Sequence, residues 1–479
     1  MEDGFLVETR FGWLPSPQAV GLLTAAVVLL AGTTLSPPAD LSVAVQRVLS
    51  VFAAALALWL TRPVPYVVSS VLSVTLLFAL GTVDSFAAAA SGYASTLVFF
   101  LLLLLLLGNA ISDVGLDREL ARRLLSAEST PRRALRSVAG SVLVLALVMP
   151  SAMARAITFI PVVERLASGF GLEDGSEFER TAFLLLGHVN PIASMALMTG
   201  GGMALVTSEI VNRSVRTVTW VEWAVLMVPP TVLLYVLAAV TAGVFTAVGG
   251  TATATEESAA DAPLAADGDG TESLTRDQRL VGAVVAGAVV SWILGSFVGV
   301  PTVLPAAAAV AALSFPHVGI VTAEDIAEIN WGVIFLIGAM LSILHVMETT
   351  GAIEVIVDLL TRYVPFAALA HWQVVAALLG IAVGVRVLFS TGSAAIVVAL
   401  PIVLEFGGIF GVDRLFLALA VLLVVGSTTL LPFNTTAVLV SMDRGPLSHR
   451  DVAAFGLLTM GLSLAVVAVS WLVYWPLVA

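Results

Sequence analysis

Cysteine is absent from the 479 residues of this chain. Its absence excludes disulfide bonds, thiolate metal sites and cysteine nucleophiles. The five histidines show no H-x-x-x-H or H-E-x-x-H spacing, so the sequence predicts no metal-ligand cluster. Lysine is absent too, and all 21 basic residues are arginines, which is typical either of a salt-loving source or of a GC-rich genome.

Charged residues are scarce as well. They make up 11% of the chain and hydrophobic residues make up 59%, whereas an average soluble domain has about 25% charged residues. A soluble protein needs polar residues over its surface, so lipid must be the solvent for much of this chain. The net charge of -12, without a basic stripe, argues against a nucleic-acid partner. We therefore expect an integral protein of the cytoplasmic membrane, surrounded by the lipid bilayer.

Apolar runs long enough to cross a bilayer recur along the chain. A spanning helix needs about 20 mostly apolar residues, and we expect about eleven transmembrane helices, plus two re-entrant hairpins, in an all-α fold. No signal-peptide pattern precedes the first run, so we expect that helix to be retained. The predicted spans are 19–35, 41–60, 66–80, 95–111, 181–198, 223–248, 280–297, 302–315, 331–346, 415–431 and 452–475.

Two parts of the chain repeat the same order of features. Ser151 precedes Pro161 and Thr391 precedes Pro401 at equal spacing, and a break in a later span follows each pair. We therefore predict two repeats, each with a hairpin and a broken helix. The predicted divisions are N-terminal scaffold helices at 1–90, a first repeat at 91–248 (hairpin 137–168, broken helix 181–215), an acidic cytoplasmic linker at 249–277, and a second repeat with the last helix at 278–479 (hairpin 374–409, broken helix 415–441).

Arginine content differs between the repeats. Segment 117–136 carries six arginines, whereas its counterpart 351–373 carries only Arg362. Because cytoplasmic loops are enriched in basic residues, the segments should face opposite sides and the repeats should have inverted topology. We expect the N-terminus and 117–136 inside the cell, and 351–373 and the C-terminus outside. Apolar positions in 116–125 also suit an amphipathic helix at the interface.

The hairpins and broken helices predict a site for an anion. The run 137–149 is too short to span the bilayer, and we expect short arms in both hairpins. Non-helical backbone at membrane depth is tolerated where it lines a cavity, and each tip begins a helix whose free N–H groups attract anions. Two alternatives stay open. The first hairpin could be one Pro-kinked helix, and Gly200–Gly202 could be a helix-packing patch.

Further motifs connect the chain with a known family. Residues 61–66 read Thr-Arg-Pro-Val-Pro-Tyr, residues 330–332 read Asn-Trp-Gly, and residues 431–436 read Leu-Pro-Phe-Asn-Thr-Thr. With the repeat pattern, they resemble the divalent anion:sodium symporter family, the transporters of sulfate, succinate, citrate and related dicarboxylates. The family carries a Ser-Asn-Thr motif at each tip. Here the tips read Ser-Ala-Met-Ala-Arg-Ala at 151–156, which resembles the citrate and 2-oxoglutarate/malate exchanger branch, and Thr-Gly-Ser at 391–393.

The resemblance implies a secondary active transporter, not an enzyme, for small di- or tricarboxylates or sulfate-like oxyanions. It implies a homodimer in which a transport domain moves as an elevator, by sodium-coupled symport or by anion exchange. No cofactor is implied besides sodium as a coupling ion. The substrate-binding candidates are Ser151, Met153, Arg155, Thr391, Gly392, Ser393, Thr207, Asn434, Thr435 and Thr436. The ion-binding candidates are Ser151, Gly201, Gly202, Ser390, Thr391 and Gly392.

Arg155 is a candidate on physical grounds as well, because an intramembrane cation costs about 2.5–3.5 kcal/mol on insertion scales. It lies on the same helix face as Ser151, and long side chains lean toward the helix N-terminus. Its planar guanidinium would suit one carboxylate of a bound dianion. The alternative is a structural ion pair with Glu209 or Glu164.

Two other functions fit parts of the sequence. A proton-coupled antiporter would use Glu164, Glu209 and Glu405 as proton carriers. An intramembrane hydrolase would use Ser151 with His188, although no nucleophile-elbow motif is present. His188 and Asn190 otherwise suit helix–helix hydrogen bonds or the lip of a cavity. The sequence leaves open the anion, the coupling ion and the direction of transport.

Overall fold

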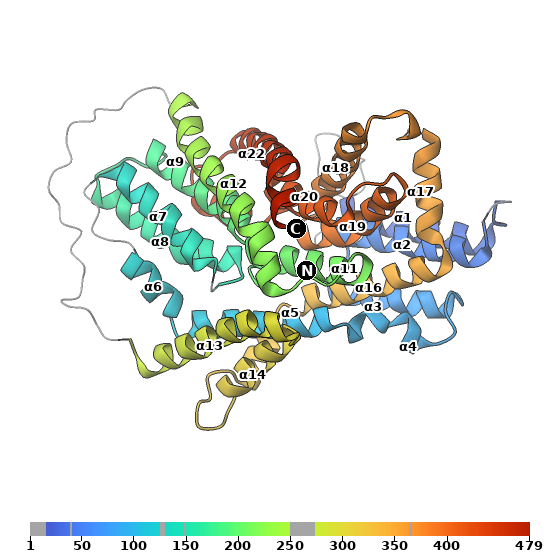
Figure 1. Ribbon diagram of the computed structural model, residues 1–479, viewed down its shortest axis with the longest axis horizontal. Coiled ribbons are helices and arrows are strands. Elements are labelled where there is room, and N and C mark those ends of the chain that lie inside the picture. The colour runs from blue at the N-terminus through green and yellow to red at the C-terminus, as the bar shows by residue number, and fades with distance from the viewer. Residues whose placement is uncertain (1–15, 39–40, 125–129, 148, 250–273, 364–365) are drawn as a thin grey trace. The chain divides into compact units, whose positions relative to one another are not determined.

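The structure, a computed structural model, describes residues 16–38, 41–124, 130–147, 149–249, 274–363 and 366–479. Every regular element in these residues is a helix (Figure 1), which confirms the all-α prediction for this part of the chain. The predicted linker 249–277 lies mostly outside the described residues: α12 ends at Gly249 and α13 begins at Arg276.

The helices group into two compact units, taken here as far as they are described. Unit 1 comprises 1–102, 330–378 and 397–412, and unit 2 comprises 103–329, 379–396 and 413–479. Three of the boundaries between the units fall inside helices, namely α5 (Thr96–Asp113), α18 (His371–Leu388) and α19 (Gly392–Ile409), and the other two, after Ile329 and after Val412, lie between helices.

Unit 1 is built around α16. Gly92 N donates to Ser342 Oγ at 3.0 Å, which fixes η1 against this helix. A Cβ on Gly92 would lie 2.3 Å from Gly338 O, so only glycine permits this close approach. The helices that lie wholly in the described part of unit 1 are α1 (Pro17–Thr34), α2 (Val43–Thr61), α3 (Tyr66–Ala79), α4 (Phe86–Ala89), η1 (Ser91–Ala94), α16 (Trp331–Thr350), α17 (Ala352–Tyr363) and η3 (Phe366–Ala368).

Unit 2 has two broken helices at its core, and they run antiparallel. Gly187 of the first faces Ser441 of the second, whereas Met195, further along the first, faces Gly426, which comes earlier in the second. The first broken helix consists of α9 (Glu177–Leu184), η2 (Leu185–Val189), α10 (Asn190–Ala193) and α11 (Gly202–Ser214). The second consists of α20 (Arg414–Ser427), η4 (Pro432–Asn434) and α21 (Thr436–Arg444).

The remaining helices of unit 2 include α12 and α22, which pack against this core. Tyr235 of α12 donates to Ala139 O of α7 at 2.7 Å, and Thr459 of α22 donates to Ser427 O of the second broken helix at 2.9 Å. The remaining helices are α6 (Leu116–Leu124), α7 (Pro131–Leu145), α8 (Ala152–Gly169), α12 (Trp220–Gly249), α13 (Arg276–Val298), α14 (Val303–Leu313), α15 (Ala323–Glu328), α22 (His449–Val469), η5 (Ser470–Tyr474) and α23 (Trp475–Val478).

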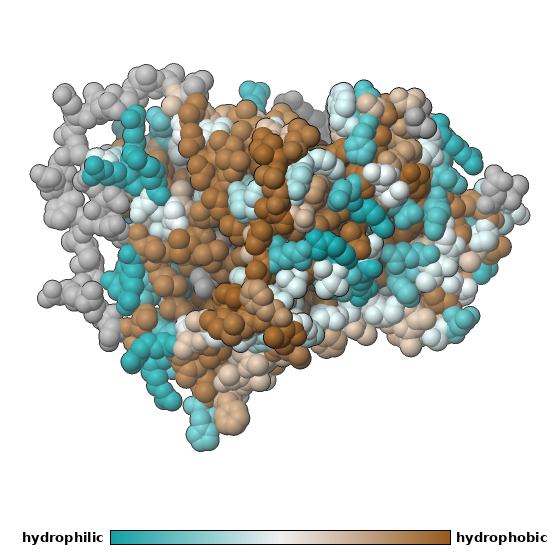
Figure 2. All heavy atoms as spheres, in the orientation of Figure 1, coloured by the Kyte–Doolittle hydropathy of each residue, from teal (hydrophilic) through white to brown (hydrophobic). Residues whose placement is uncertain are grey.

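Nine helical stretches among the described residues are long and apolar enough to cross a membrane. They are α1, α2, α5, α12, α13, α16, α18, α19 and the stretch from α22 to α23. Three predicted spans form shorter apolar helices instead, namely α3, α14 and α20. Hydrophobic side chains cover wide areas of the face in Figure 2, and Leu472 and Leu477 are 76% and 79% exposed. Such exposed apolar surface identifies a multi-pass membrane protein.

The arms of the predicted hairpins are longer than expected. Helix α7 begins at Pro131 rather than at 137, because proline at the first helical position has its φ preset for the helix. Helices α18 and α19 have 18 residues each and qualify as membrane spans by length and composition. The expectation of short arms is therefore wrong for the second hairpin.

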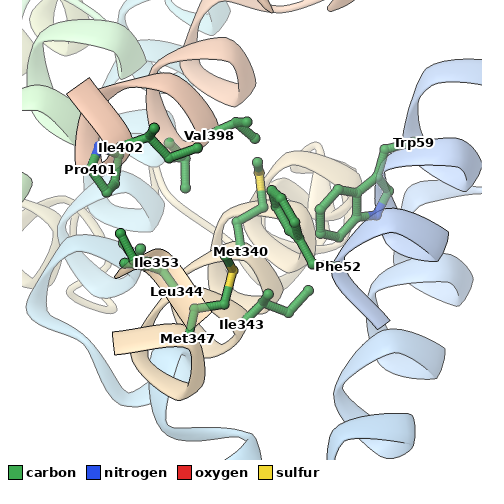
Figure 3. A pocket seen from close by; sticks show the side chains of 11 residues that line it. Phe52, Trp59, Met340, Ile343, Leu344, Met347, Ile353, Val398, Pro401 and Ile402 are labelled. Carbon is green, nitrogen blue, oxygen red and sulfur yellow. The ribbon is translucent and has the colours of Figure 1, made fainter. Parts of the chain in front are cut away.

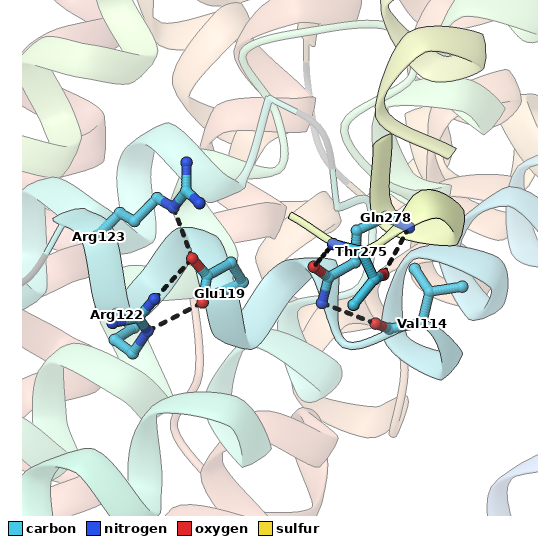
Figure 4. Close-up of polar contacts among 6 residues, drawn as sticks. All are labelled: Val114, Glu119, Arg122, Arg123, Thr275 and Gln278. Carbon is cyan, nitrogen blue, oxygen red and sulfur yellow. Dashed lines mark hydrogen bonds and ion pairs between the residues drawn. The ribbon is translucent and has the colours of Figure 1, made fainter. Parts of the chain in front are cut away.

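The arginine-rich segment begins with α6, which occupies the stretch predicted to be amphipathic. Glu119 accepts hydrogen bonds from Arg122 Nε at 2.9 Å and Arg123 Nε at 2.6 Å (Figure 4). These bonds hold the pKa of Glu119 below its usual value, so their contribution is lost as the pH falls through that lowered pKa. Beside α6, Gln278 Nε2 of α13 donates to Val114 O at 3.1 Å, which joins the two segments (Figure 4).

Candidate functional site

The first tip, residues 149–151, lies between α7 and α8 in unit 2. Ser151 caps α8, because its Oγ accepts a hydrogen bond from Ala154 N at 3.2 Å. Ser151 and Ala152 are half-buried, and Met153 is 41% exposed. The first tip therefore presents a helix N-terminus and one hydroxyl group.

Arg155 is fully buried behind the first tip. Its guanidinium donates to Asn190 Oδ1 at 2.7 Å, to Ser194 Oγ at 2.7 Å, to Asn190 O at 3.2 Å and to Met149 O. Each of these acceptors is a neutral oxygen, and together they connect the tip with the first broken helix. We call Met149, Arg155, Asn190 and Ser194 the first arginine cluster.

Asn190 reaches the tip because the first broken helix is irregular there. The helix passes through the π-helical turn η2, and Pro191 then removes a backbone donor. Asn190 Nδ2 donates to Ala152 O at 2.7 Å and to Leu186 O at 3.1 Å. Asn190 thus has the helix–helix role predicted for it.

The second tip, residues 389–393, lies between α18 and α19. Arg386, in the last turn of α18, is 2% exposed. Its guanidinium donates to Phe389 O at 2.9 Å, to Asn434 O at 2.7 Å and to Val425 O at 3.0 Å. These acceptors are again neutral oxygens, from the tip and from the second broken helix. We call Arg386, Phe389, Val425 and Asn434 the second arginine cluster.

Asn434 completes the second arginine cluster from the break in its helix. Its Nδ2 donates to Val387 O at 3.0 Å and to Phe389 O at 2.9 Å. Its Oδ1 accepts from Leu431 N at 2.9 Å, which shapes the turn at η4. The asparagine therefore holds the second tip and the break together.

The two arginine clusters share their chemistry but not their positions. In each, a guanidinium donates to a carbonyl of its own tip and to the backbone carbonyl of an asparagine in a broken helix. When the two tips are aligned on the prolines that follow them, Arg155 falls opposite Ala395, and Arg386 falls opposite Ala146. The arginines therefore lie on opposite arms of their hairpins.

Both tips meet the start of α11. A Cβ on Gly201 would lie 3.4 Å from Pro150 O of the first tip. A Cβ on Gly202 would lie 2.8 Å from Ser393 Oγ of the second tip. Gly201 is the N-cap residue of α11, and as a glycine it has no side chain to accept a hydrogen bond from the first turn of this helix. The start of α11 therefore lies in contact with residues of both tips.

The electrostatics of this region favour negative charge. Helices α8, α11 and α19 begin here, and helix N-termini carry partial positive charge. The guanidinium groups of Arg155 and Arg386 add full positive charges, and the bonds described above pair neither of them with an acid. Helix N-termini and fixed cations would therefore both stabilise a bound anion.

The predicted site residues fall into two groups. Ser151, Gly202, Ser390, Thr391, Gly392, Ser393 and Thr435 are half-buried, and Met153 and Thr436 are exposed. Arg155, Thr207 and Asn434 are 0% exposed, and Gly201 is buried. Thr207 Oγ1 donates to Met203 O at 2.9 Å inside its own helix. The first group lies on the tips and breaks, whereas the polar atoms of the second group bond within the protein.

The carboxylates considered as alternatives lie elsewhere. Glu209 binds Arg213 at 2.8 Å, and Glu164 is exposed. An ion pair of Arg155 with either glutamate is therefore wrong, because the guanidinium binds neutral oxygens instead. Glu405 is half-buried. The three glutamates therefore offer no buried carboxylate for a proton carrier.

The side chains considered for a hydrolase are engaged separately. Ser151 Oγ caps α8, whereas His188 Nε2 bonds Val452 O at 3.2 Å. The ring of His188 also packs edge-on against Phe455, with ring centroids 5.3 Å apart. His188 thus makes the helix–helix contact predicted as the alternative.

A separate apolar pocket lies in unit 1 (Figure 3). Phe52 and Trp59 of α2 line it together with Met340 and Met347 of α16, and Ile402 of α19 adds a further wall. Its lining contains no charged side chain. This pocket therefore does not suit a dianion, and the tips remain the candidate site.

The sequence analysis did not identify Arg386 as a site residue, although its position in an apolar segment could have indicated it. Arg386 is the only charged residue in the apolar helix α18, and an intramembrane cation needs a partner or a purpose. Its acceptors are backbone carbonyls and carry no signal in the sequence.

Comparison with known proteins gives the chain its family. A protein of Cupriavidus necator described as "Membrane protein" is 23% identical over 491 residues, covering 96% of this chain and 94% of that protein. A family model described as "Sodium:sulfate symporter transmembrane region" matches residues 17–479. Because this match covers nearly the whole chain, the family expected from the motifs is confirmed: the protein belongs to the sodium:sulfate symporter family.

Proposed function

We propose that this protein is a secondary active transporter that carries a small di- or tricarboxylate, or a divalent oxyanion such as sulfate, across the cytoplasmic membrane. The observation that carries the proposal is the meeting of both tips at the start of α11, with Pro150 beside Gly201 and Ser393 beside Gly202. Such convergence of discontinuous helices suits a substrate site in a membrane transporter.

The groups at this place suit an oxyanion or a carboxylate. Ser151, Thr391 and Ser393 are half-buried hydroxyl residues beside helix N-termini. Thr435 Oγ1 caps α21 by accepting from Ala437 N at 3.2 Å, and Thr436 follows it with an exposed side chain. We assign direct anion contacts to these hydroxyls and to the free N–H groups of α11.

Arg155 acts on the anion through its charge rather than through direct contact. Its four hydrogen bonds use Nε and both terminal nitrogens, and its side chain has no exposed surface. A fixed charge in a medium of low dielectric still stabilises a nearby anion. We further propose, from the family resemblance, a homodimer that works as an elevator.

Counterflow into proteoliposomes tests the transport function. The purified protein is reconstituted in vesicles loaded with unlabelled sulfate, succinate, citrate or phosphate, and uptake of the same labelled anion is followed with and without sodium. We expect saturable uptake of sulfate, succinate or citrate and little uptake of phosphate. Vesicles that accumulate none of these anions above protein-free vesicles would contradict the proposal.

Two substitutions locate the site. Gly392→Ala places a Cβ 2.1 Å from Met203 Sδ at the second tip, whereas Gly384→Ala places one in open space on α18. We expect Gly392→Ala to raise the KM for the anion, because Met203 must shift at the start of α11. Gly384→Ala serves as the matched control and should transport like the unmodified protein. Equal kinetics for both variants would remove the second tip from the site.

A further inference from the structure

Two adjacent prolines interrupt the backbone hydrogen bonds of α12. Pro229 and Pro230 lie inside this helix, and proline has no backbone N–H group. In a regular α-helix, the two missing N–H groups would bond Val225 O and Leu226 O. Each proline ring also crowds the carbonyl group four residues before it. Two successive carbonyl groups of α12 therefore lack their regular helical donors.

The segment formed by η5 and α23 supplies two donors to these carbonyl groups. Tyr474 Oη donates to Val225 O at 2.5 Å, and Trp475 Nε1 donates to Leu226 O at 3.0 Å. Tyr474 is the last residue of the π-helical turn η5, and such turns are rare and recur at functional sites. Two neighbouring side chains thus replace, one for one, the donors that the prolines lack. We call Tyr474 and Trp475 the aromatic clamp.

Trp475 is held in place by other aromatic rings as well. Its side chain is 0% exposed, and its ring centroid lies 5.5 Å from that of Phe416, near the start of α20. The ring of Trp471 lies 6.3 Å from Trp475 and 5.7 Å from Phe416. Contacts of this kind favour particular ring orientations. The indole N–H of Trp475 is therefore kept directed at α12.

The two prolines lie between two contacts that α12 makes with the candidate site. At the start of α12, Trp220 Nε1 donates to Thr199 Oγ1 at 3.2 Å. Thr199 belongs to the break that precedes α11. Beyond the prolines, Tyr235 Oη donates to Ala139 O of α7, the first arm of the first hairpin, at 2.7 Å. A change of bend at the prolines would therefore move the break relative to the hairpin.

We propose that the aromatic clamp holds α12 at one bend, and that it thereby positions the first break and the first hairpin for anion binding. The second half of this inference rests on the proposed transport function. Two missing hydrogen bonds leave a point in α12 that can bend, and donors from the neighbouring segment make it rigid. Tyr474 and Trp475 are positioning residues, because they act on the anion through α12.

A double-mutant cycle tests the clamp without transport. Tyr474→Phe leaves Val225 O without a donor at membrane depth, and the Tm of the purified protein should fall by about 2–4 °C. Pro229→Ala restores the helical N–H group, so Tyr474→Phe should have little effect on the Tm in that background. Trp475→Phe and Pro230→Ala form a second cycle with the same expectation. Equal losses of Tm with and without the proline overturn the clamp.

Tyr93→Phe is the matched control. Tyr93 Oη also donates to a helix carbonyl, Phe335 O, at 3.1 Å, but the residue four positions further on is Ala339, which has an N–H group. The effect of Tyr93→Phe on the Tm should therefore be the same with and without Pro229→Ala. If a clamp variant does not fold alone, the matching proline substitution should restore folding. Failure to restore it overturns the clamp.

Spin labels measure the bend directly in this cysteine-free chain. Thr217→Cys precedes α12 and Val240→Cys lies beyond the prolines, and both positions are exposed. We expect a narrow distribution of distances between the two labels with the clamp intact, and a broader one after Tyr474→Phe with Trp475→Phe. Adding Pro229→Ala and Pro230→Ala should narrow the distribution again. Equal widths in all three backgrounds contradict a clamp that fixes the bend.

The last test uses the anion found by counterflow. Tyr474→Phe should raise the KM several-fold with little change in the maximal rate, because fewer carriers hold the break and the hairpin in the binding arrangement. An unchanged KM overturns the positioning role and leaves the transport function in place. If no anion moves with the unmodified protein, the proposed function fails, and the unfolding and distance measurements still decide whether the clamp holds α12.

Discussion

At the residue scale, the asparagine beside each buried arginine also makes hydrogen bonds that join the tip to the broken helix. The side-chain amide of Asn434 donates hydrogen bonds to Val387 O and Phe389 O and accepts one from Leu431 N. Its neighbour Thr436 lies two residues further on, with an exposed side chain. The two residues are close in the sequence, yet they should affect different properties of the transporter.

Asn434→Ala should lower the stability, and Thr436→Ala should lower transport. Each buried polar group left without a partner costs about 1–3 kcal/mol, so the first variant should show a clearly lower Tm. The second removes a hydroxyl from the proposed anion site and should raise the KM with little change in Tm. Unfolding and counterflow measured on both variants check this. A normal Tm for Asn434→Ala would mean that the second tip is held by other contacts.

The sequence predicted that Arg155 matters but not what it binds. The insertion cost of a cation identified the residue, whereas its acceptors include backbone carbonyls and an amide, which no charge pattern reveals. The charge of Glu209 made it an expected partner, but Glu209 forms an ion pair with Arg213 on the following helical turn. The hydroxyl candidates at the tips came from helix capping, a local effect that sequence spacing does show.

At the element scale, the close crossing of η1 and α16 should be the most sensitive point of unit 1. Gly92→Ala would place a Cβ 2.3 Å from Gly338 O and from Ser342 N, and backbone atoms cannot move aside as a side chain can. Overpacking of this kind costs about 1–3 kcal/mol or more. We therefore expect a marked loss of folded protein after extraction in detergent.

Gly287→Ala is the control for this substitution, because a Cβ on Gly287 meets nothing within 4 Å. It should behave like the unmodified protein in fluorescence-detected size-exclusion chromatography and in thermal unfolding. Equal stability of the Gly92 and Gly287 variants would show that η1 can move away from α16.

The positions of the helices could be predicted from the sequence more accurately than their lengths. The break predicted at Gly200–Gly202 is present, because α11 starts at Gly202. The second hairpin, predicted at 374–409, corresponds to α18 and α19, but these helices have 18 residues each and are long enough to cross a membrane, whereas short arms were expected.

At the scale of the whole molecule, the predicted orientation can be tested with single cysteines in this cysteine-free chain. Arg118 and Arg362 are both exposed, one in the arginine-rich segment and one in its counterpart. Arg118→Cys should react with a membrane-impermeant maleimide only in inside-out vesicles, and Arg362→Cys only in intact cells. Reaction of both from the same side would refute the inverted topology.

Composition alone predicted a membrane protein, because so few charges are available to cover its surface. The division into two compact units could not be predicted from the composition. Three of its boundaries fall inside α5, α18 and α19, and nothing in the local sequence of an apolar helix marks a boundary between packing partners.

The positions of the two arginines also indicate how they arose during the evolution of the protein. Arg155 follows its tip and Arg386 precedes its own, and each faces an alanine in the alignment of the tips. If the two predicted repeats arose by duplication of one gene, a single ancestral arginine would occupy equivalent places in both. We infer that the two guanidinium groups were acquired in separate events. Relatives that keep one arginine and have lost the other would be the surviving record, and strict co-occurrence of both across the family would speak against this order of events.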